Sequence, residues 1–243
     1  GQALFANLDF LDGTRGAHVN ISGISGVATK TTYATFLLHS LFGGGALGQE
    51  AVNTKALVFN VKGEDLLFMD QPNARLSATH RRAYEHLGLP AAPFRSFAVF
   101  APPRRNDPNA GPDVASRASG VHAFFWTLQE FCVEELLPFV FADAEDERQQ
   151  YTMIVHHLTA KLKRDHQPVG EDGAVKLTVD GEVVRTYHQF VDQIVELLTD
   201  DTTRDDWAGR ATTLGSVNAF IRRLGSSASR LARIVRADVP RRA

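Results

Sequence analysis

Residues 23–32 combine the residue types that bind phosphate groups. They contain two glycines, Gly23 and Gly26, and end in the run Thr29-Lys30-Thr31-Thr32. Glycines allow a backbone to curl so that its N–H groups point at an anion, a lysine reaches the β- and γ-phosphates, and a threonine hydroxyl binds Mg²⁺. A helix that starts at such a loop adds a partial positive charge. The stretch therefore predicts a phosphate-binding loop of the P-loop kind.

The flanking residues predict the elements that would position this loop. Residues 17–22 alternate between apolar and polar side chains, which is typical of a short strand. After the loop, apolar residues recur at helical spacing and predict a helix that ends at Gly43: Tyr33, Phe36, Leu37 and Leu41. The continuous apolar run at residues 55–61 predicts a buried parallel strand. Together these elements form a right-handed βαβ unit, so we expect an α/β fold with a parallel sheet.

The loop differs from the usual motif at two points. Gly23 lies seven residues before Lys30, one more than usual, and Thr29 stands before the lysine where glycine is usual. Threonine adopts a positive φ poorly, so either the loop follows another path or the extra residue relieves the strain. The alternative interpretation is a glycine-rich turn of an α/β domain that binds nothing.

The same residues resemble a known family. Residues 18–31 and 56–64 are similar to the Walker A region and the following strand of HerA/FtsK-type P-loop ATPases. That family usually has Asp-x-x-Gly-Glu in the second segment, and Asn60 occupies the Asp position here. The resemblance covers about residues 10–70. It implies a P-loop NTPase fold of the RecA-like kind, with a parallel sheet core, that binds ATP and Mg²⁺ and hydrolyses ATP.

Motif and resemblance together imply a role for each loop residue. Lys30 would neutralise the β- and γ-phosphates, and Thr31 would bind Mg²⁺. The remaining residues would surround the phosphates, mainly through backbone amides: Gly23, Ser25, Gly26, Val27, Ala28, Thr29 and Thr32. The resemblance also implies a homo-oligomeric, hexameric ring that moves along double-stranded DNA as a translocase or helicase, beside a nuclease or other partner protein.

Glu64 and Asp65 follow the second predicted strand. Open parallel sheets bind ligands at the carboxyl ends of their strands, so either carboxylate could position the attacking water or the water shell of Mg²⁺. We assign Glu64 as the candidate for this role. A solvated turn at the start of a helix explains the two acids equally well.

An ATPase of this class also needs an apolar strand that ends in Asp, together with a Glu. Residues 66–70 end in Asp70 but no Glu follows, and residues 139–143 end in Asp143 within a segment whose neighbours predict a helix. We therefore expect the true element beyond Ala243, in a longer polypeptide. The missing element and the altered loop together favour an alternative function, a P-loop scaffold that binds a nucleotide or a partner protein without turnover.

The whole chain predicts three parts. Residues 1–101 would form the ATPase core, residues 102–200 a mainly helical insertion, and residues 201–243 a basic C-terminal helical segment. The Asp180-Gly181 pair predicts a β-hairpin near residues 175–185. Further elements are expected as a helix at 77–87, a strand at 94–100, a surface loop at 102–120, and helices at 128–137, 145–163, 187–198 and 216–235.

Charge is distributed unevenly along the chain. Residues 210–243 contain eight arginines and one acid, Asp238, so they carry +7, whereas residues 1–209 carry −9 of the net −2. In the last predicted helix an apolar stripe would face the core and arginines such as Arg222 and Arg230 would face outward. This basic face is a candidate for contact with DNA or with the nucleotide of a neighbouring subunit. The alternative is a solvated helix surface.

Composition excludes several classes of protein. With 243 residues, 44% hydrophobic and 22% charged, the chain is neither disordered nor of low complexity. No apolar run approaches the roughly 20 residues of a membrane span, so no membrane partner is expected. The single cysteine, Cys132, excludes an intrachain disulfide and a thiolate metal cluster, which indicates a reducing, cytoplasmic location. No Asn-Lys-x-Asp motif is present, which argues against a GTPase.

Overall fold

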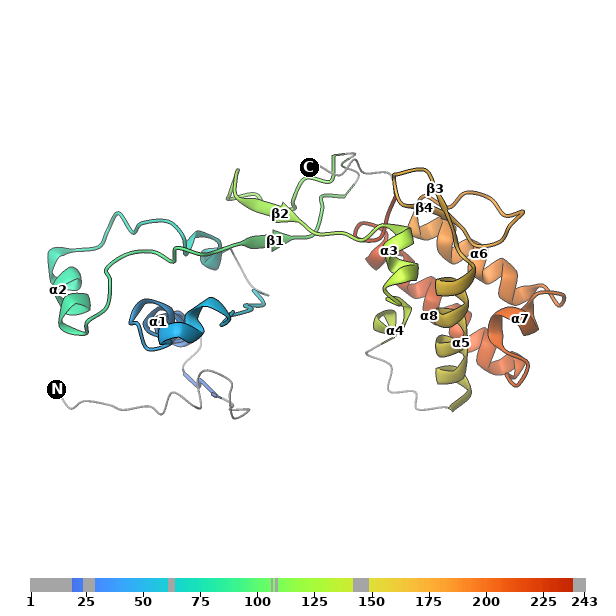
Figure 1. The fold of residues 1–243 in the computed structure, drawn as a ribbon, viewed down its shortest axis with the longest axis horizontal. Helices are drawn as coiled ribbons and strands as arrows, with labels where there is room; N and C mark the ends of the chain where they lie inside the picture. Colours follow the sequence, from blue (N-terminus) through green and yellow to red (C-terminus); the bar gives the residue numbers. More distant parts are fainter. Residues whose placement is uncertain are drawn as a thin grey trace. The chain divides into compact units, whose positions relative to one another are not determined.

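The computed structural model describes residues 19–23, 29–60, 64–105, 107, 109–141 and 149–237. In these residues helices predominate, and the strands form one parallel and one antiparallel pair, so the fold is mixed α/β. The chain divides after Phe97 into two compact units (Figure 1).

The first unit is built from helices. Its elements are α1 (Thr29–Gly43), the 3-10 helices η2 (Gly48–Val52) and η3 (Asp65–Phe68), and α2 (Ala78–His86). Ser77 caps α2, because its hydroxyl accepts a hydrogen bond from the His80 amide at 3.2 Å. Both helices that the sequence predicts in this unit are therefore confirmed.

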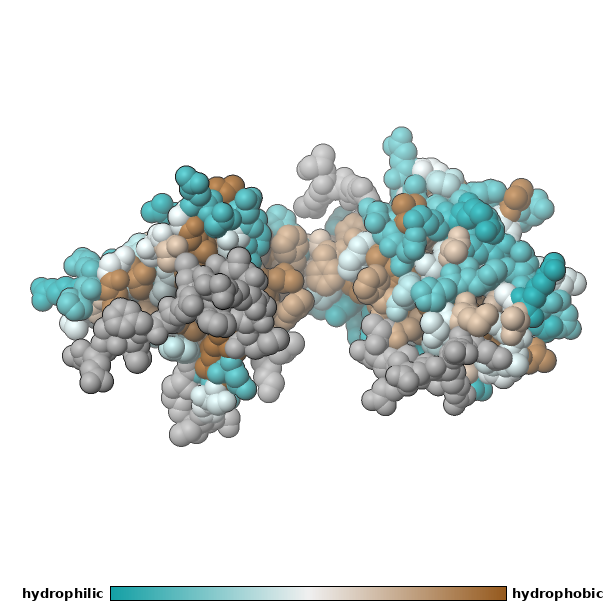
Figure 2. Space-filling view, turned by 60° about the horizontal axis from the view of Figure 1, so that its bottom comes forward, coloured by the Kyte–Doolittle hydropathy of each residue, from teal (hydrophilic) through white to brown (hydrophobic). Residues whose placement is uncertain are grey.

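The two strands predicted on either side of the loop are wrong for the described residues. Residues 19–22 and 55–60 have no regular secondary structure, and residues 17, 18 and 61 lie outside the described part. A strand must pair its backbone groups with a neighbour, and the described part of this unit contains no strand with which these segments could pair. Leu57 and Phe59 are consequently 79% and 81% exposed, and apolar side chains reach the surface of this unit (Figure 2).

The second unit contains the parallel sheet. Strand β1 (Val99–Ala101) pairs in parallel with β2 (Val121–Ala123), with Phe100 opposite His122. The predicted strand at residues 94–100 therefore forms only at its end. The predicted loop at residues 102–120 is confirmed as lacking helices and strands in its described residues, and it serves as the crossover connection between β1 and β2.

Six helices follow in the described part of the second unit: α3 (Leu128–Val133), α4 (Leu137–Val140), α5 (Gln149–Asp165), α6 (Tyr187–Thr199), α7 (Arg204–Ala208) and α8 (Leu214–Leu231). The sequence predicts one helix at residues 128–137, but the chain leaves α3 at Glu134 and begins α4 near Pro138. Proline is favourable in a first turn because its missing N–H would have no acceptor there. The five-residue α7 was not predicted.

The core of the second unit lies among α5, α6 and α8. Ile154, Leu158, Phe190, Phe220 and Leu224 are fully buried there. The apolar stripe predicted for the last helix faces this core, since Val217 and Leu224 are buried and the remaining helical members pack against it: Ile221, Ala228 and Leu231. The second unit thus has a continuous hydrophobic core, whereas Leu47 is the single buried hydrophobic residue described in the first unit.

An antiparallel hairpin joins α5 to α6. Strand β3 (Gln167–Val169) pairs with β4 (Ala174–Lys176), and Val175 also exchanges two backbone hydrogen bonds with Val184. The Asp180-Gly181 pair lies in the turn between Val175 and Val184, where the sequence places a reversal. The tighter turn, between β3 and β4, uses Gly170 and Gly173 at positive φ.

Gly173→Ala is expected to destabilise the second unit by roughly 2–4 kcal/mol. Its φ is +76°, and an added Cβ would lie 2.4 Å from Cβ of Thr127, the residue that caps α3. Gly170→Ala is the control, because its φ is similar but its Cβ would meet nothing closer than 3.6 Å. Urea unfolding followed by circular dichroism measures both variants. Equal losses in the two would show that the contact with Thr127 has no effect.

Candidate functional site

Three of the predicted phosphate-binding residues have described side chains at the start of α1. The helix begins at Thr29, so Lys30, Thr31 and Thr32 occupy its first turn, and all three are exposed. The first four N–H groups of an α-helix have no acceptor within the helix. No acidic residue stands in the first turn of this described helix, so no carboxylate within that turn offsets its partial positive charge.

The structure describes the other loop residues only in part. Gly23 is exposed and is the last residue described before the loop. Ser25, Gly26, Val27 and Ala28 lie outside the described residues, and only the backbone of Thr29 is described.

The second half of α1 holds the helix against α2 and the segment before the second unit. Nε2 of His39 donates to the carbonyl oxygen of Ala92 at 3.0 Å, and the His39 ring meets the rings of Tyr84 and Phe94 edge-on, each with centroids 5.6 Å apart. Gly44 closes the helix, with its amide donating to the Ser40 carbonyl at 2.9 Å. This end is fixed by side chains, and the opposite end, with Lys30, faces solvent.

Glu64 does not lie at the end of a strand. It is half-buried and precedes η3, and its carbonyl oxygen accepts a hydrogen bond from the Leu67 amide at 3.1 Å. The strand-end argument for Glu64 and Asp65 therefore fails, because the strand before them is not formed. The assignment of Glu64 as a catalytic residue therefore rests on the Gly-Glu pair of the family resemblance.

An ATPase of this class needs an apolar strand that ends in Asp, and two segments of the sequence resemble one. Neither of them forms a strand in the described residues. Residues 66–68 lie in η3, and Asp70 lies in the turn that follows. Phe139 and Val140 lie in α4, and Asp143 is outside the described part. In the described residues, no group of three His, Cys, Asp or Glu side chains is placed to hold a metal ion.

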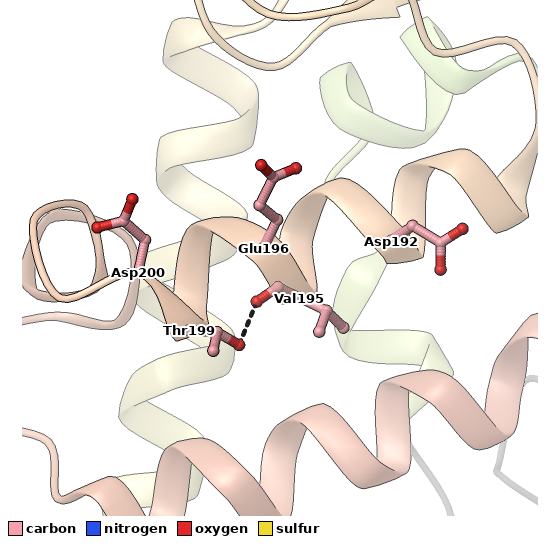
Figure 3. A pocket seen from close by; sticks show the side chains of 5 residues that line it. All are labelled: Asp192, Val195, Glu196, Thr199 and Asp200. Carbon is pink, nitrogen blue, oxygen red and sulfur yellow. Dashed lines mark hydrogen bonds between the residues drawn. The ribbon is translucent and has the colours of Figure 1, made fainter.

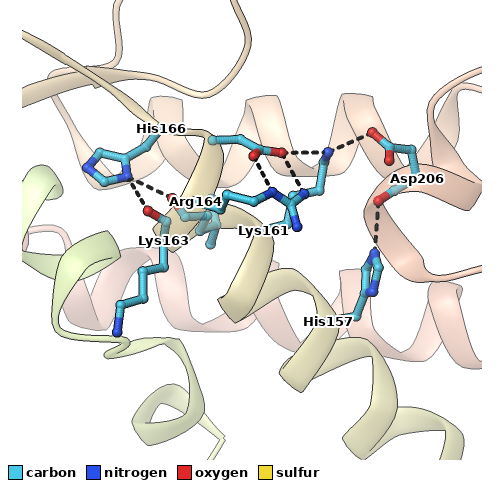
Figure 4. Close-up of polar contacts among 8 residues, drawn as sticks. His157, Lys161, Lys163, Arg164, His166 and Asp206 are labelled. Carbon is cyan, nitrogen blue, oxygen red and sulfur yellow. Dashed lines mark hydrogen bonds and ion pairs between the residues drawn. The ribbon is translucent and has the colours of Figure 1, made fainter.

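A polar cluster joins α5 to α7 in the second unit (Figure 4). The side chain of Lys161 is 8% exposed, and its Nζ lies 2.9 Å from Asp165, 2.6 Å from Asp206 and 4.8 Å from the ring centroid of Trp207. Nε2 of His157 donates to the backbone carbonyl of Asp206 at 2.9 Å. The sequence contains one sign of this cluster, the Lys161–Asp165 spacing of four residues, but this spacing does not identify the partners on α7.

The charges in this cluster shift each other's pKa values. Hydrogen bonds from Arg164, and then from Lys161, lower the pKa of Asp165 to about 2, although partial burial opposes them. Burial lowers the pKa of Lys161, but hydrogen bonds to Asp206 and Asp165 outweigh it and the net shift is upward. Every charge is thus matched within the protein, which indicates a structural role.

Lys161→Met is expected to destabilise the second unit by about 2 kcal/mol at pH 7, because it removes a nearly buried cation from two carboxylates and from the Trp207 ring. The folded pKa of Asp165 is below its usual 3.8, so this contribution is present above about pH 4 and is lost as pH falls towards 2. The difference between variant and wild type should therefore shrink between pH 4 and pH 2 in urea unfolding.

Lys163→Met is the matched control on the same helix. Lys163 pairs with Glu135, and both side chains are about half exposed, so its loss should change stability by less than about 0.5 kcal/mol. If Lys161→Met were as mild as this control, the cluster would not stabilise the fold.

Two hollows lie elsewhere on the molecule. One, of about 520 Å³, runs along α6 and is lined by Asp192, Val195, Glu196, Thr199 and Asp200 (Figure 3). The three carboxylates that line it point in different directions, and their negative charge disfavours the binding of phosphate groups. The other, of about 280 Å³, lies between α1 and α2 and is mainly apolar: Phe36, Leu76, His80, Ala83, Tyr84 and Leu87. Neither hollow is lined by a residue of the predicted loop.

Comparison with known proteins identifies no family for this chain. No protein-family model matches it, and no curated protein is significantly similar to it in sequence. Among the described residues, no helix is both long enough and apolar enough to cross a membrane.

Proposed function

We propose that the chain is the ATP-binding subunit of a P-loop ATPase of the HerA/FtsK type that acts on DNA. The observation that supports this most strongly is the placement of Lys30 and Thr31 in the exposed first turn of α1, directly after the segment that contains Gly23 and Gly26 in the sequence. The proposed fold is a P-loop NTPase fold of the RecA-like kind, with a mainly helical insertion.

In this proposal each residue has a defined task. The amides of residues 23–32 bind the phosphate oxygens, and the ammonium of Lys30 neutralises the charge that develops on the γ-phosphoryl group. The Thr31 hydroxyl would hold Mg²⁺, which when bound compensates the charge of the β- and γ-phosphates. The Glu64 carboxylate would orient the attacking water.

The partners in this proposal follow from charge and from the family resemblance. Arg222 and Arg230 are exposed on α8, and the apolar face of this helix packs into the core. They would contact the phosphates of double-stranded DNA, or the nucleotide of the next subunit in a homo-oligomeric ring. A nuclease or another protein would bind the same ring.

A scaffold that binds a nucleotide without hydrolysing it is the second candidate. Thr29 before the lysine favours it, and so does the absence, from the described residues, of a strand that ends in an acid.

Nucleotide binding and phosphate release, measured on the same protein, separate these functions. Binding of ATP with Mg²⁺, together with phosphate release that linear double-stranded DNA accelerates, is the expected result for the ATPase. Binding without release, with or without DNA, would select the scaffold. Failure to bind any nucleoside triphosphate would contradict both.

A further inference from the structure

An exposed row of aromatic side chains lies on the β1–β2 sheet and on the segment that directly follows β2. Phe100 is 65% exposed, Phe124 36% and Trp126 39%, and His122 is also exposed. Side chains alternate between the faces of an extended chain, so positions 122, 124 and 126 share one face, and Phe100 joins them through its register with His122. We refer to these four residues as the aromatic row.

The rings of the aromatic row contact each other in pairs. The centroids of Phe100 and His122 are 5.5 Å apart, and those of Phe124 and Trp126 are 6.1 Å apart. The backbone beneath them is fixed, since the Phe124 amide donates to Ala101 at 3.0 Å and the Trp126 amide donates to Ile234 at 2.8 Å. The row is therefore a preformed surface, with ring faces or edges open to solvent.

The segments next to this row are rich in arginine, in a chain whose first 209 residues are acidic. The loop between β1 and β2 and the segment at residues 232–237 together contain five arginines and two aspartates: Arg104, Arg105, Arg117, Arg233, Arg236, Asp107 and Asp113. Both aspartates are engaged locally, because Asp113 pairs with Arg233 at 3.1 Å and the Asp107 carboxylate accepts two backbone amides at 2.9 Å. The Arg236 amide donates to the Trp126 carbonyl oxygen, and the Arg236 guanidinium donates to the carbonyl oxygen of Asp107 at 3.3 Å, so the backbone of residue 236 lies next to the row.

We infer that this face binds single-stranded nucleic acid, with bases stacked on the aromatic row and phosphates near the arginines. Exposed aromatic rings on a sheet, flanked by positive charge, are the elements that bind unpaired bases without strong sequence preference. A duplex keeps its bases stacked inside and cannot use the rings in this way. The inference goes beyond the proposed function, because it concerns the second unit and requires no ATP binding.

Tryptophan fluorescence tests the inference directly. The chain has two tryptophans, and Trp207 is 3% exposed, so quenching by an added oligonucleotide reports on Trp126. Titration with a 20-nucleotide oligo(dT) at low salt should give saturable quenching. Phe100→Ala and Phe124→Ala should each weaken binding by about tenfold, and raised salt should weaken it further.

Phe139→Ala is the matched control, because Phe139 is 74% exposed on α4 and lies outside the aromatic row. It should bind oligo(dT) as the wild type does, and so should Lys30→Ala, which separates this test from that of the proposed function. Absence of quenching, equal quenching by a duplex of the same length, or equal loss in the control would overturn the inference. Fluorescence that changes with protein concentration alone would instead identify the row as a protein interface.

Discussion

Lys30→Ala is expected to lower kcat/KM for ATP hydrolysis by a factor of about 100 to 1,000. Lys30 is the cation in the exposed first turn of α1, and the proposed site relies on it to compensate charge on the β- and γ-phosphates. Because its side chain is exposed, its removal should leave the folded structure unchanged. Steady-state phosphate release at a range of ATP concentrations measures this effect.

Lys55→Ala is the matched control for this prediction. Lys55 is also an exposed lysine of the first unit, but it lies outside the loop. Its loss changes the net charge equally and should leave hydrolysis within about twofold of wild type. If both variants were equally active, the assignment of Lys30 would be wrong.

Phe190→Ala is expected to destabilise the second unit by about 4 kcal/mol. The ring is fully buried on α6, with its centroid 5.4 Å from that of Phe131 and 5.8 Å from that of Tyr187. Removing it leaves a cavity in the core that α5 and α8 also form. A loss of this size approaches the total stability of many domains, so we expect a much lower urea midpoint.

Phe139→Ala serves as the control here as well. The same atoms are removed, but Phe139 is 74% exposed, so the unfolding free energy should change by less than about 0.5 kcal/mol. Equal midpoints for the two variants would contradict the core arrangement in the second unit.

Several helices could be predicted because their signals are local. Ser77, Thr186 and Thr213 cap α2, α6 and α8 through their hydroxyls, and the apolar periodicity of α8 matches the face that it buries. Capping and periodicity depend on residues within about four positions of each other, so the sequence contains them directly.

The strands could not be predicted in the same way. The apolar run at residues 55–60 has the composition of a buried strand, but pairing depends on a distant partner, and none is formed in the described part of its unit. At β2 the sequence predicts no strand although one is formed. Its three residues carry no distinctive pattern, and they form a strand because they pair with β1.

The sequence predicted the candidate site in part. The apolar spacing after the loop predicted a helix there, but α1 begins at Thr29, inside the predicted loop, so the roles of residues 29–32 stay predictions. The position of Glu64 depended on a strand that is not formed, so its role stays a prediction. The Lys161 cluster was missed because α7, which supplies Asp206 and Trp207, is too short to show a periodic pattern.

Backbone hydrogen exchange with bound nucleotide tests the central claim most directly. If the amides of residues 23–32 surround a phosphate, a non-hydrolysable ATP analogue with Mg²⁺ should slow exchange in the peptide that contains them, and Lys30→Ala should remove this protection at the same nucleotide concentration. Tight nucleotide binding with unchanged exchange in that peptide would contradict the account.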